Sequence, residues 1–471
     1  DNDKQGGLEY ADMLSTDLRN YEKAETVLRR RLLDQHVNDR DGMLALGDVF
    51  MNWADEDPEK YGDAVKIYSR LIELYGENDT FLLRMMRYFI RTDNLAEVLN
   101  LKDYFSSRIT KIGAANLTEL SGYLLEKRYN PQPLDSEKLR AKIDDVRMLL
   151  EKAVQTDKTM PEAYYNLGRF FIYNNKQDGA IENLTEAIKL FETAAPMTAR
   201  RTVRYVDAMR LLGEQLVEQK KYLDAQTLYA DALSIYRDYT AFKPLPPNRD
   251  IGKLYADYGD IDYFISGDIQ TAFRNYKAAV ENGYDTPSVR YRIGFVQYTD
   301  GNYAEALGSF IKTASEDASN RNLLLALGNV LSIRGDQAAA RGYYERLIRI
   351  LDSDRERFGI LFPQVREDQY ALVDLYLKAS NNLGVTLSRL AVQTGNSSLQ
   401  AQAVAQFAES VRAWDALTRN QKTMVRLEGS NLAAQNIKYI TYPQRSFEPA
   451  IYASIPAVLY GETGLKQYSL E

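Results

Sequence analysis

Apolar and small residues recur along the chain in a pattern that predicts paired helices. One clear example spans residues 161–192. Its first stripe, spaced three and four residues apart on one helical face, is Tyr164, Leu167 and Phe171. Asn174 and Asn175 then break the helix. A second stripe follows at Ala180, Leu184, Ala187 and Leu190. The pattern therefore predicts two antiparallel helices joined by a short turn.

Recurrent glycines predict that the two helices of each pair approach closely. Gly168 lies inside the first helix, where a glycine costs about 1 kcal/mol relative to alanine. Glycines recur at equivalent positions, each 12 residues before a small residue of the second helix: Gly213, Gly294 and Gly328. Such a repeated cost indicates a contact that a larger residue would prevent. Gly301 and Gly335 occupy the turns between helices, where glycine supplies the left-handed conformation that ends a helix.

The small residue that opens each second helix, which we call the anchor, recurs with a fixed period. The step is 34 residues from Ala272 to Ala306 and again from Ala306 to Ala340. A period of this length is typical of stacked helix-pair solenoids. We expect about nine or ten pairs. The anchors are Ala24, Ala64, Val98, Val146, Ala180, Ala225, Ala272, Ala306, Ala340 and Ala403.

These positions resemble the tetratricopeptide repeat (TPR). Within residues 161–192 the resemblance covers, position for position, Tyr164, Leu167, Gly168, Phe171, Ala180, Leu184 and Ala187, and it is strong over residues 161–350. It returns at Ile293, Gly294, Gly301, Asn302, Tyr303, Ala306 and Phe310. It implies an all-α fold, a right-handed superhelical solenoid of antiparallel helix pairs, with inserted longer helices or loops and an extended C-terminal tail.

The quality of the repeat divides the chain into four expected segments. They are degenerate repeats at 1–160, well-formed repeats at 161–350 with insertions near 188–205 and 240–252, C-terminal helical repeats at 351–437, and a tail rich in Tyr and Pro at 438–471. The insertions are either spacers or loops that carry partner contacts. Three arginines at 198–204 are interpreted as the exposed part of a projecting helix pair. Three prolines within 244–247 predict an extended segment.

Two apolar stretches outside the repeats are candidate binding segments. The helical period stops after Ile437, and the tail that follows either packs along the final helices as a cap or binds another copy or a partner. The run from Phe358 to Phe362 must either dock back on the array or form a partner surface. The candidate partner-binding residues here are Phe358, Phe362, Tyr442, Phe447 and Tyr452.

Composition excludes several classes of function. The net charge is −7, which argues against nucleic acid or an acidic membrane surface as partner unless a local basic patch overrides it. There is no cysteine and one histidine, His36, so thiolate sites and the usual triads and zinc sites cannot be assembled. No segment has the roughly 18 apolar residues of a membrane span. We therefore expect no enzyme, no catalytic residues, no cofactor, no metal, no small-molecule substrate and no membrane insertion.

The resemblance implies that the first helix of each pair lines a concave groove. The groove candidates for partner binding are Tyr165, Asn166, Arg169, Tyr173, Arg210, Glu214, Tyr291, Arg292, Tyr298, Asn322 and Asn329. Asn166 with Arg169 is faintly similar to the clamp by which some TPR proteins hold a C-terminal carboxylate. Leu211 and Glu214 stand where the next unit would need basic or amide groups, which argues against that clamp.

Two functional hypotheses follow. The first, favoured by the length of the array, is a non-enzymatic scaffold that binds several proteins, or itself, in an assembly. The second is an adaptor whose groove grips one extended segment of a single partner. The tyrosine-rich repeats, the lack of cysteine and the stretches 381–384 and 431–436 are similar to large TPR proteins of spirochaetes, some of which build the periplasmic collar of the flagellar motor. We therefore expect a scaffold of the bacterial envelope or periplasm with a role in bacterial flagellum assembly. The alternative location is the cytoplasm. The chain, which opens at Asp1 without a leader, is expected to be a segment of a longer protein.

Overall fold

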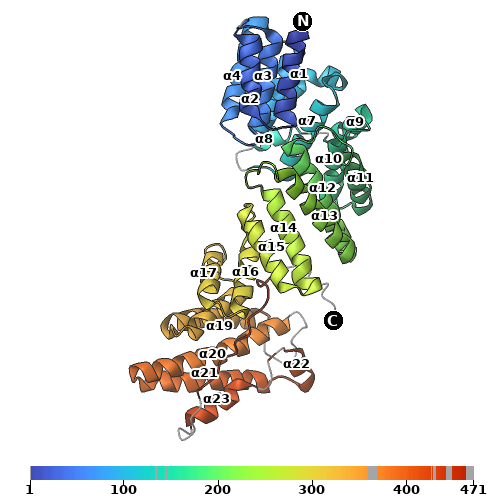
Figure 1. The fold of residues 1–471 in the computed structure, drawn as a ribbon. Coiled ribbons are helices and arrows are strands. Elements are labelled where there is room, and N and C mark those ends of the chain that lie inside the picture. Colours follow the sequence, from blue (N-terminus) through green and yellow to red (C-terminus); the bar gives the residue numbers. More distant parts are fainter. Residues whose placement is uncertain are drawn as a thin grey trace. The chain divides into compact units, whose positions relative to one another are not determined.

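The computed structural model describes residues 2–34, 36–132, 136–143, 146–358, 369–425, 427, 431–441 and 448–462. Within these residues, helices are the regular secondary structure and no strand occurs (Figure 1). The all-α array of helix pairs is therefore confirmed. None of the described helices is both long enough and apolar enough to cross a membrane.

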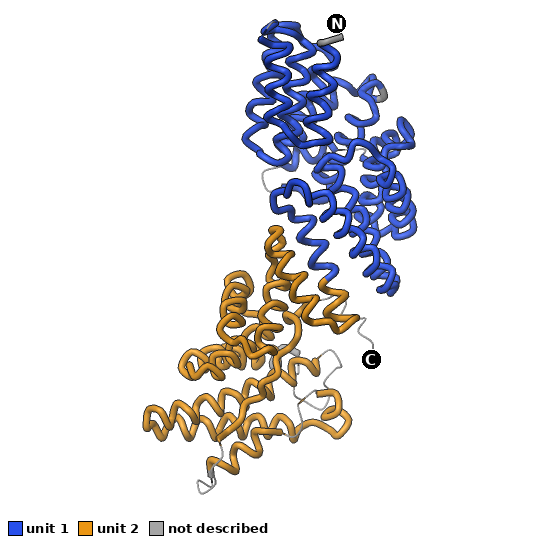
Figure 2. Tube along the Cα trace, in the orientation of Figure 1, with its two compact units in different colours: residues 1–258 blue, residues 259–471 orange. Residues whose placement is uncertain are grey.

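The chain forms two compact units, residues 1–258 and residues 259–471 (Figure 2). The division falls within α14 (Arg249–Ile261). This division lies inside residues 161–350, which the sequence analysis treats as one segment of well-formed repeats. The four predicted segments stay a prediction.

Unit 1 contains six consecutive helix pairs before α14. The pairs are α1 (Asn2–Thr16) with α2 (Tyr21–Leu28), α3 (Arg40–Trp53) with α4 (Lys60–Tyr75), α5 (Asp79–Arg91) with α6 (Leu95–Phe105), α7 (Ala114–Tyr129) with α9 (Val146–Thr156), α10 (Pro161–Tyr173) with α11 (Gln177–Phe191), and α12 (Ala199–Glu218) with α13 (Tyr222–Thr240). Three short elements join them: a π-helix (Arg29–Leu33), a 3₁₀-helix (Ser106–Ile112) and α8 (Glu137–Arg140).

Unit 2 continues the array after a π-helical turn (Asp262–Ser266). Its helices are α15 (Ile269–Glu281), α16 (Pro287–Thr299), α17 (Tyr303–Ala314), α18 (Arg321–Ile333), α19 (Gln337–Phe358), α20 (Tyr370–Thr394), α21 (Ser397–Asp415), α22 (Arg419–Met424) and α23 (Leu432–Thr441). The pairs α16–α17, α18–α19 and α20–α21 pack as antiparallel neighbours.

Local sequence signals set the ends of these helices. Pro161 and Pro287 occupy the first turns of α10 and α16, where a missing N–H costs nothing. Gly301 and Gly335 adopt φ values of 80° and 89° in the turns before the second helices. This left-handed conformation is the one predicted for them, since glycine reaches it without steric cost.

The predicted anchors form the spine of the core. All ten are at most 2% exposed, and each lies in the second helix of its pair. The ten second helices of the described residues agree with the upper end of the expected repeat number. The repeat register read from the 34-residue period is therefore confirmed.

Glycines of the first helices face large side chains of the second helices, as predicted. A Cβ atom on Gly294 would lie 2.6 Å from Cε1 of Phe310, and one on Gly168 would lie 2.8 Å from Cγ of Leu184. The same contact occurs where the sequence analysis assigned no glycine: Gly47 against Tyr68, and Gly384 against Phe407. The close approach therefore extends into the degenerate repeats at both ends.

Two local expectations are wrong. The helical pattern does not stop after Ile437, because α23 continues to Thr441. The arginines at 198–204 do not form an exposed projection. The helix pair α12–α13 is long, at 20 and 19 residues, as expected, but α12 turns these arginines toward other helices of unit 1.

We expect Gly294→Leu to lower the free energy of unfolding of unit 2 by about 3 kcal/mol, because the new side chain collides with Phe310. The two tryptophans, Trp53 and Trp414, lie in different units, so Trp414 fluorescence in a Trp53→Phe background reports urea unfolding of unit 2. The control is Gly308→Leu, since Gly308 lies on the exposed side of α17 with open space around it. A Gly294 variant as stable as the control would contradict the repeat register.

Candidate functional site

In unit 2, the first helices of three pairs, α16, α18 and α20, form one surface. The helix α23, which belongs to none of these pairs, adds to that surface. We call the surface made by first helices the inner face. Residues 448–462, which we call the tail, lie along the inner face of unit 2 without helix or strand of their own. The tail bonds to side chains up to 170 residues earlier in the sequence. An extended segment therefore occupies this face.

Asparagine side chains hold the backbone of the tail. The amide of Asn382 donates to the carbonyl of Tyr452 at 2.9 Å and accepts from its N–H at 2.8 Å. The same two-bond pairing occurs at two more places, Asn436 with Ala450 and Asn320 with Tyr460. Each pairing engages both polar groups of one residue's backbone, so it holds an extended chain whatever its side chains are.

The five predicted groove residues of unit 2 all lie on this face and contact the tail. They are Tyr291, Arg292, Tyr298, Asn322 and Asn329. Asn322 donates to the carbonyl of Val458 at 2.7 Å, and the hydroxyl of Tyr291 donates to the carbonyl of Pro456 at 2.7 Å. In the structure these residues therefore bind the chain's own tail. That they bind a separate partner stays a prediction.

The tail also contributes apolar side chains to the core. Tyr452 is 1% exposed, and its hydroxyl accepts the N–H of Leu432 at 2.7 Å. Ile455, Val458 and Leu459 are buried as well. Of the two alternatives for the predicted tail 438–471, the structure therefore shows packing along the chain's own helices for residues 448–462. Tyr452 was expected to contact a partner, but in this arrangement its ring is inaccessible.

The other loop and tail candidates cannot be placed in the fold. Phe362, Tyr442 and Phe447 lie outside the described residues. Phe358 is the last residue of α19, and its side chain also lies outside them.

Sequence reasoning missed the asparagines of α20 and α23 as contacts of the tail. Asn381, Asn382 and Asn436 are fully buried. Asparagine is a poor residue inside a helix because its side chain competes for backbone hydrogen bonds. Two adjacent asparagines in the middle of an apolar helix were therefore the available signal. They had been noted as a resemblance and not as a binding feature.

We expect Asn382→Ala to lower the free energy of unfolding of unit 2 by about 2 kcal/mol, because it leaves the buried N–H of Tyr452 without a partner. The tail should also lose protection selectively. Hydrogen exchange read by mass spectrometry on peptides spanning residues 448–462 measures this loss.

The matched control for this substitution is Asn302→Ala. Asn302 is exposed, and its side chain forms no capping hydrogen bond. We expect the control to change stability by less than about 0.5 kcal/mol. Equal exchange in both variants would show that the asparagine pairings do not hold the tail.

Unit 1 has a cavity of about 860 Å³ on its inner face, which we call the channel. Its walls come from α7, α10, α12 and the start of α14. The six predicted groove residues of unit 1 all line it: Tyr165, Asn166, Arg169, Tyr173, Arg210 and Glu214. The sequence register therefore identified this face, and its use by a partner stays a prediction.

Charged pairs hold one side of the channel. Asp207 accepts from the hydroxyl of Tyr165 at 2.6 Å and from Nε of Arg210 at 2.8 Å. Burial alone would raise the pKa of Asp207, but the charge of Arg210 and the hydrogen bond from Tyr165 hold it below its usual value. Arg210 also pairs with Glu214 at 2.8 Å and Asp257 at 3.1 Å. The guanidinium is thus fixed by three carboxylates.

The predicted residues of α10 differ in how far they are already engaged. Arg169 pairs with Glu126 and lies over the rings of Tyr165 and Tyr173, at 5.5 and 5.9 Å from their centroids. Asn166 is 2% exposed and donates to the carbonyl of Thr118 at 3.0 Å, which ties α10 to α7. A clamp for a C-terminal carboxylate would need this amide, so the structure also argues against that clamp.

Part of the proline-rich segment 242–248, which we call the strap, lines one wall of the channel through residues 245–248. Residues 244–248 form no helix or strand, which agrees with the helix-breaking effect expected of the prolines. Arg19, in the turn between α1 and α2, donates to the carbonyls of Lys243 at 2.6 Å and Pro244 at 3.2 Å. Lys243 returns a hydrogen bond to the carbonyl of Arg19 at 3.0 Å. The strap therefore connects the end of unit 1 to its first helix pair.

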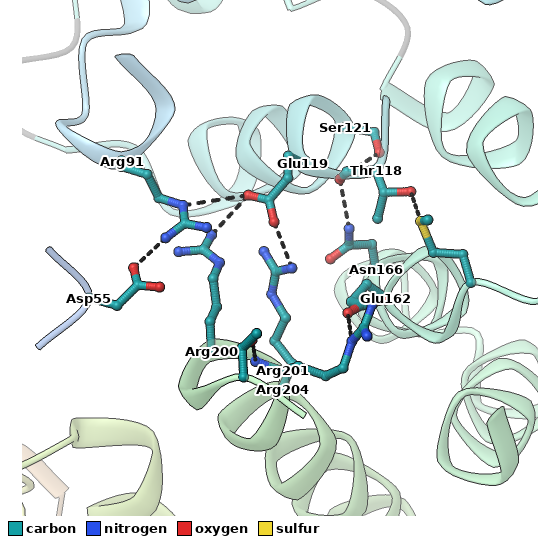
Figure 3. Close-up of polar contacts among 12 residues, drawn as sticks. Asp55, Arg91, Thr118, Glu119, Ser121, Glu162, Asn166, Arg200, Arg201 and Arg204 are labelled. Atoms are coloured by element: carbon teal, nitrogen blue, oxygen red, sulfur yellow. Dashed lines mark hydrogen bonds and ion pairs between the residues drawn. The ribbon is translucent and has the colours of Figure 1, made fainter. Parts of the chain in front are cut away.

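Arginines from two helices converge on Glu119 of α7 (Figure 3). Arg200 and Arg204 of α12 reach its carboxylate at 3.1 and 2.8 Å. Arg91 of α5 lies 3.8 Å away and also pairs with Asp55. Burial alone would raise the pKa of Glu119, but the charges of Arg200 and Arg204 hold it well below its usual range.

This network predicts an acid-sensitive unit 1. The native pKa of Glu119 lies below the unfolded value of about 4.3, so its contribution is complete above that pH and is lost as pH falls through the native pKa. We expect Glu119→Gln to cost about 3 kcal/mol at pH 7 and to flatten the loss of stability below pH about 4. Urea titrations followed by Trp53 fluorescence in a Trp414→Phe background measure this.

The control for Glu119 is Glu305→Gln. Glu305 is exposed on α17 and belongs to unit 2. We expect it to leave the Trp53 transition unchanged at every pH. If the Glu119 variant still lost stability below pH about 4 as steeply as the unchanged protein, other carboxylates would cause the acid sensitivity.

Stacked helix pairs with two inner faces define a helical-repeat solenoid. The tetratricopeptide repeat family matches two segments, residues 161–193 and 297–355. The chain therefore contains tetratricopeptide repeats, and this repeat supports a role as a protein–protein interaction scaffold. No curated protein matches its sequence.

Several solved structures are similar in fold to this chain at low sequence identity. PilF of Pseudomonas aeruginosa has 16% identity and a TM-score of 0.38, over 50% of this chain and 93% of that chain. YrrB is described as a TPR protein with an unusual peptide-binding site. It has 18% identity and a TM-score of 0.34, over 43% of this chain and 91% of that chain. The Cut9–Hcn1 hetero-tetramer of the APC/C has 15% identity and a TM-score of 0.43, over 72% of this chain and 57% of that chain.

Proposed function

We propose that this protein is a non-enzymatic scaffold, and that the channel of unit 1 holds an extended segment of a partner protein. The observation that carries the proposal is the tail in unit 2. There, an inner face built from the same kind of helix pairs holds an extended segment through side chains of its first helices.

The channel of unit 1 also presents side chains that can bind a protein segment, although their chemistry differs from that of unit 2. Arg169 and Tyr173 combine cationic, aromatic and hydroxyl groups at the cavity wall. Tyrosine and arginine are enriched at protein interfaces because they supply large contact area and hydrogen bonds together. The cavity volume of about 860 Å³ is ample for several residues of extended chain.

The adaptor with a single partner is the alternative function. It is favoured by the confinement of the large channel to unit 1. The scaffold is favoured because unit 2 supplies a second inner face of different chemistry, whose own tail covers the asparagine pairings. Ten second helices also give far more surface than one peptide needs.

For location, we propose the bacterial cell envelope, in a flagellar motor assembly. The support is the absence of cysteine together with the similarity to spirochaete TPR proteins described from the sequence. Immunogold labelling of sectioned cells tests this placement, and label confined to the cytoplasm would overturn it.

Site-specific photocrosslinking tests the channel. Val203 lines the cavity and is partly buried. We expect benzoylphenylalanine at position 203 of the full chain to crosslink a defined segment of a partner protein in cells of the source organism, because that position faces the channel. Mass spectrometry of the adduct identifies the segment.

The control position is Val392, a valine of unit 2 that is 81% exposed. The same adduct at positions 203 and 392 would indicate non-specific capture. No adduct at position 203 would overturn the proposed use of the channel. Several different partner proteins recovered together would favour the scaffold over the adaptor.

A further inference from the structure

A second cavity of unit 1, of about 440 Å³, has more arginine in its lining than any other residue type. Seven arginines and three carboxylates line it, although the chain as a whole has a net charge of −7. The charged residues that this cavity and the channel share are Asp55, Arg91, Glu119, Arg200 and Arg204. Positive charge is therefore concentrated where the two cavities meet.

The shared residues carry more positive than negative charge. Arg91, Arg200 and Arg204 surround Glu119, and Asp55 is the second carboxylate of the group. Three guanidiniums thus share two carboxylates. Because the group is largely shielded from water, its unbalanced charge interacts more strongly with an incoming anion than a surface charge would.

The arginines keep hydrogen-bonding capacity in reserve. Within the described residues, the buried Nε atoms of Arg91 and Arg200 have no hydrogen-bond partner. The side chain of Arg200 is 33% exposed, so its tip can be reached from the cavity. Burial and the nearby charge of Arg91 lower the pKa of Arg200 to about 9, which an added anion would reverse.

The wall of the cavity adds a further positive charge. Arg87 lines it and forms no ion pair with any residue that the structure describes. Arg84 beside it pairs with Asp48 at 3.0 Å. The basic surface therefore extends along α5 from the cluster on Glu119, and a ligand with more than one anionic group could contact both places.

The surroundings favour carboxylates of a protein over a nucleic acid. Single-stranded nucleic acids need rows of rings for stacking, but Tyr21 is the one aromatic side chain among the described residues of this cavity. In the channel, the rings of Tyr165 and Tyr173 are already covered by Arg169. The three carboxylates of the lining would repel a continuous phosphate backbone. Planar guanidinium groups pair well with separate carboxylates, which present two oxygens in matching geometry.

We propose that the partner segment held by unit 1 is acidic, with carboxylates seated on Arg91, Arg200 and Arg204. This inference rests on the proposed function and adds the chemistry of the bound segment. It explains why an acidic protein concentrates arginine on one inner face.

Fluorescence anisotropy with a labelled octa-glutamate peptide and the full chain tests the inference. We expect the peptide to bind, and an octa-glutamine peptide not to bind. Arg200→Gln should weaken binding about tenfold, as loss of a charge-assisted pair does. Arg200→Lys should weaken binding less than Arg200→Gln, because the charge remains but the planar guanidinium group is lost. Binding should also weaken as salt is raised.

Two further variants separate the site from folding and from general attraction. Arg87→Gln breaks no ion pair of the described residues and should also weaken binding. Arg274→Gln removes an exposed charge of α15 in unit 2 and should leave binding unchanged. Equal effects at positions 200 and 274 would overturn the inference, as would the absence of octa-glutamate binding.

Two outcomes distinguish this inference from the proposed function. Tighter binding of single-stranded oligoadenylate than of octa-glutamate would show a phosphate-binding surface and overturn the acidic segment. A crosslinked partner segment at position 203 that lacks acidic residues would also overturn it, while leaving the channel's use intact.

Discussion

In seven of the ten helix pairs among the described residues, the two helices approach closely because the first helix carries a glycine, which has no side chain, at the contact. Gly294 faces Phe310, and Gly328 faces Tyr344. Glycine inside a helix costs about 1 kcal/mol, but the ring it admits stabilises by burying apolar area worth roughly 1.5–3 kcal/mol. Because the contact recurs, these pairs have a similar shape, and similar shapes can stack into an array.

Stacking creates a second requirement, which the two units meet differently. The first helices bring polar side chains together on an inner face, where buried polar groups need partners. In unit 2 the partners are peptide groups of the tail, held by asparagines such as Asn382. In unit 1 they are opposite charges, such as Glu119 with Arg204. The amide face suits an extended backbone of any sequence, whereas the charged face selects by charge.

Much of the fold could be predicted from the sequence, because anchors such as Ala306 and glycines such as Gly294 act within one repeat. The groove residues were found by the same register. The partner of Asn322 could not be found, since Val458 is 136 residues away and no local pattern links them. Arg200 was misjudged because a charge run usually faces solvent. Only the fold shows that Glu119, 81 residues earlier, draws it inward.

The order of synthesis gives the tail a further consequence. A ribosome extends a chain at about 5–20 residues per second, and early segments fold first. The helices that receive the tail are complete before the tail leaves the ribosome. During that interval the amides of Asn329 and Asn382 face water or any other extended strand nearby. Until the tail is in place, another extended strand can therefore compete for this face.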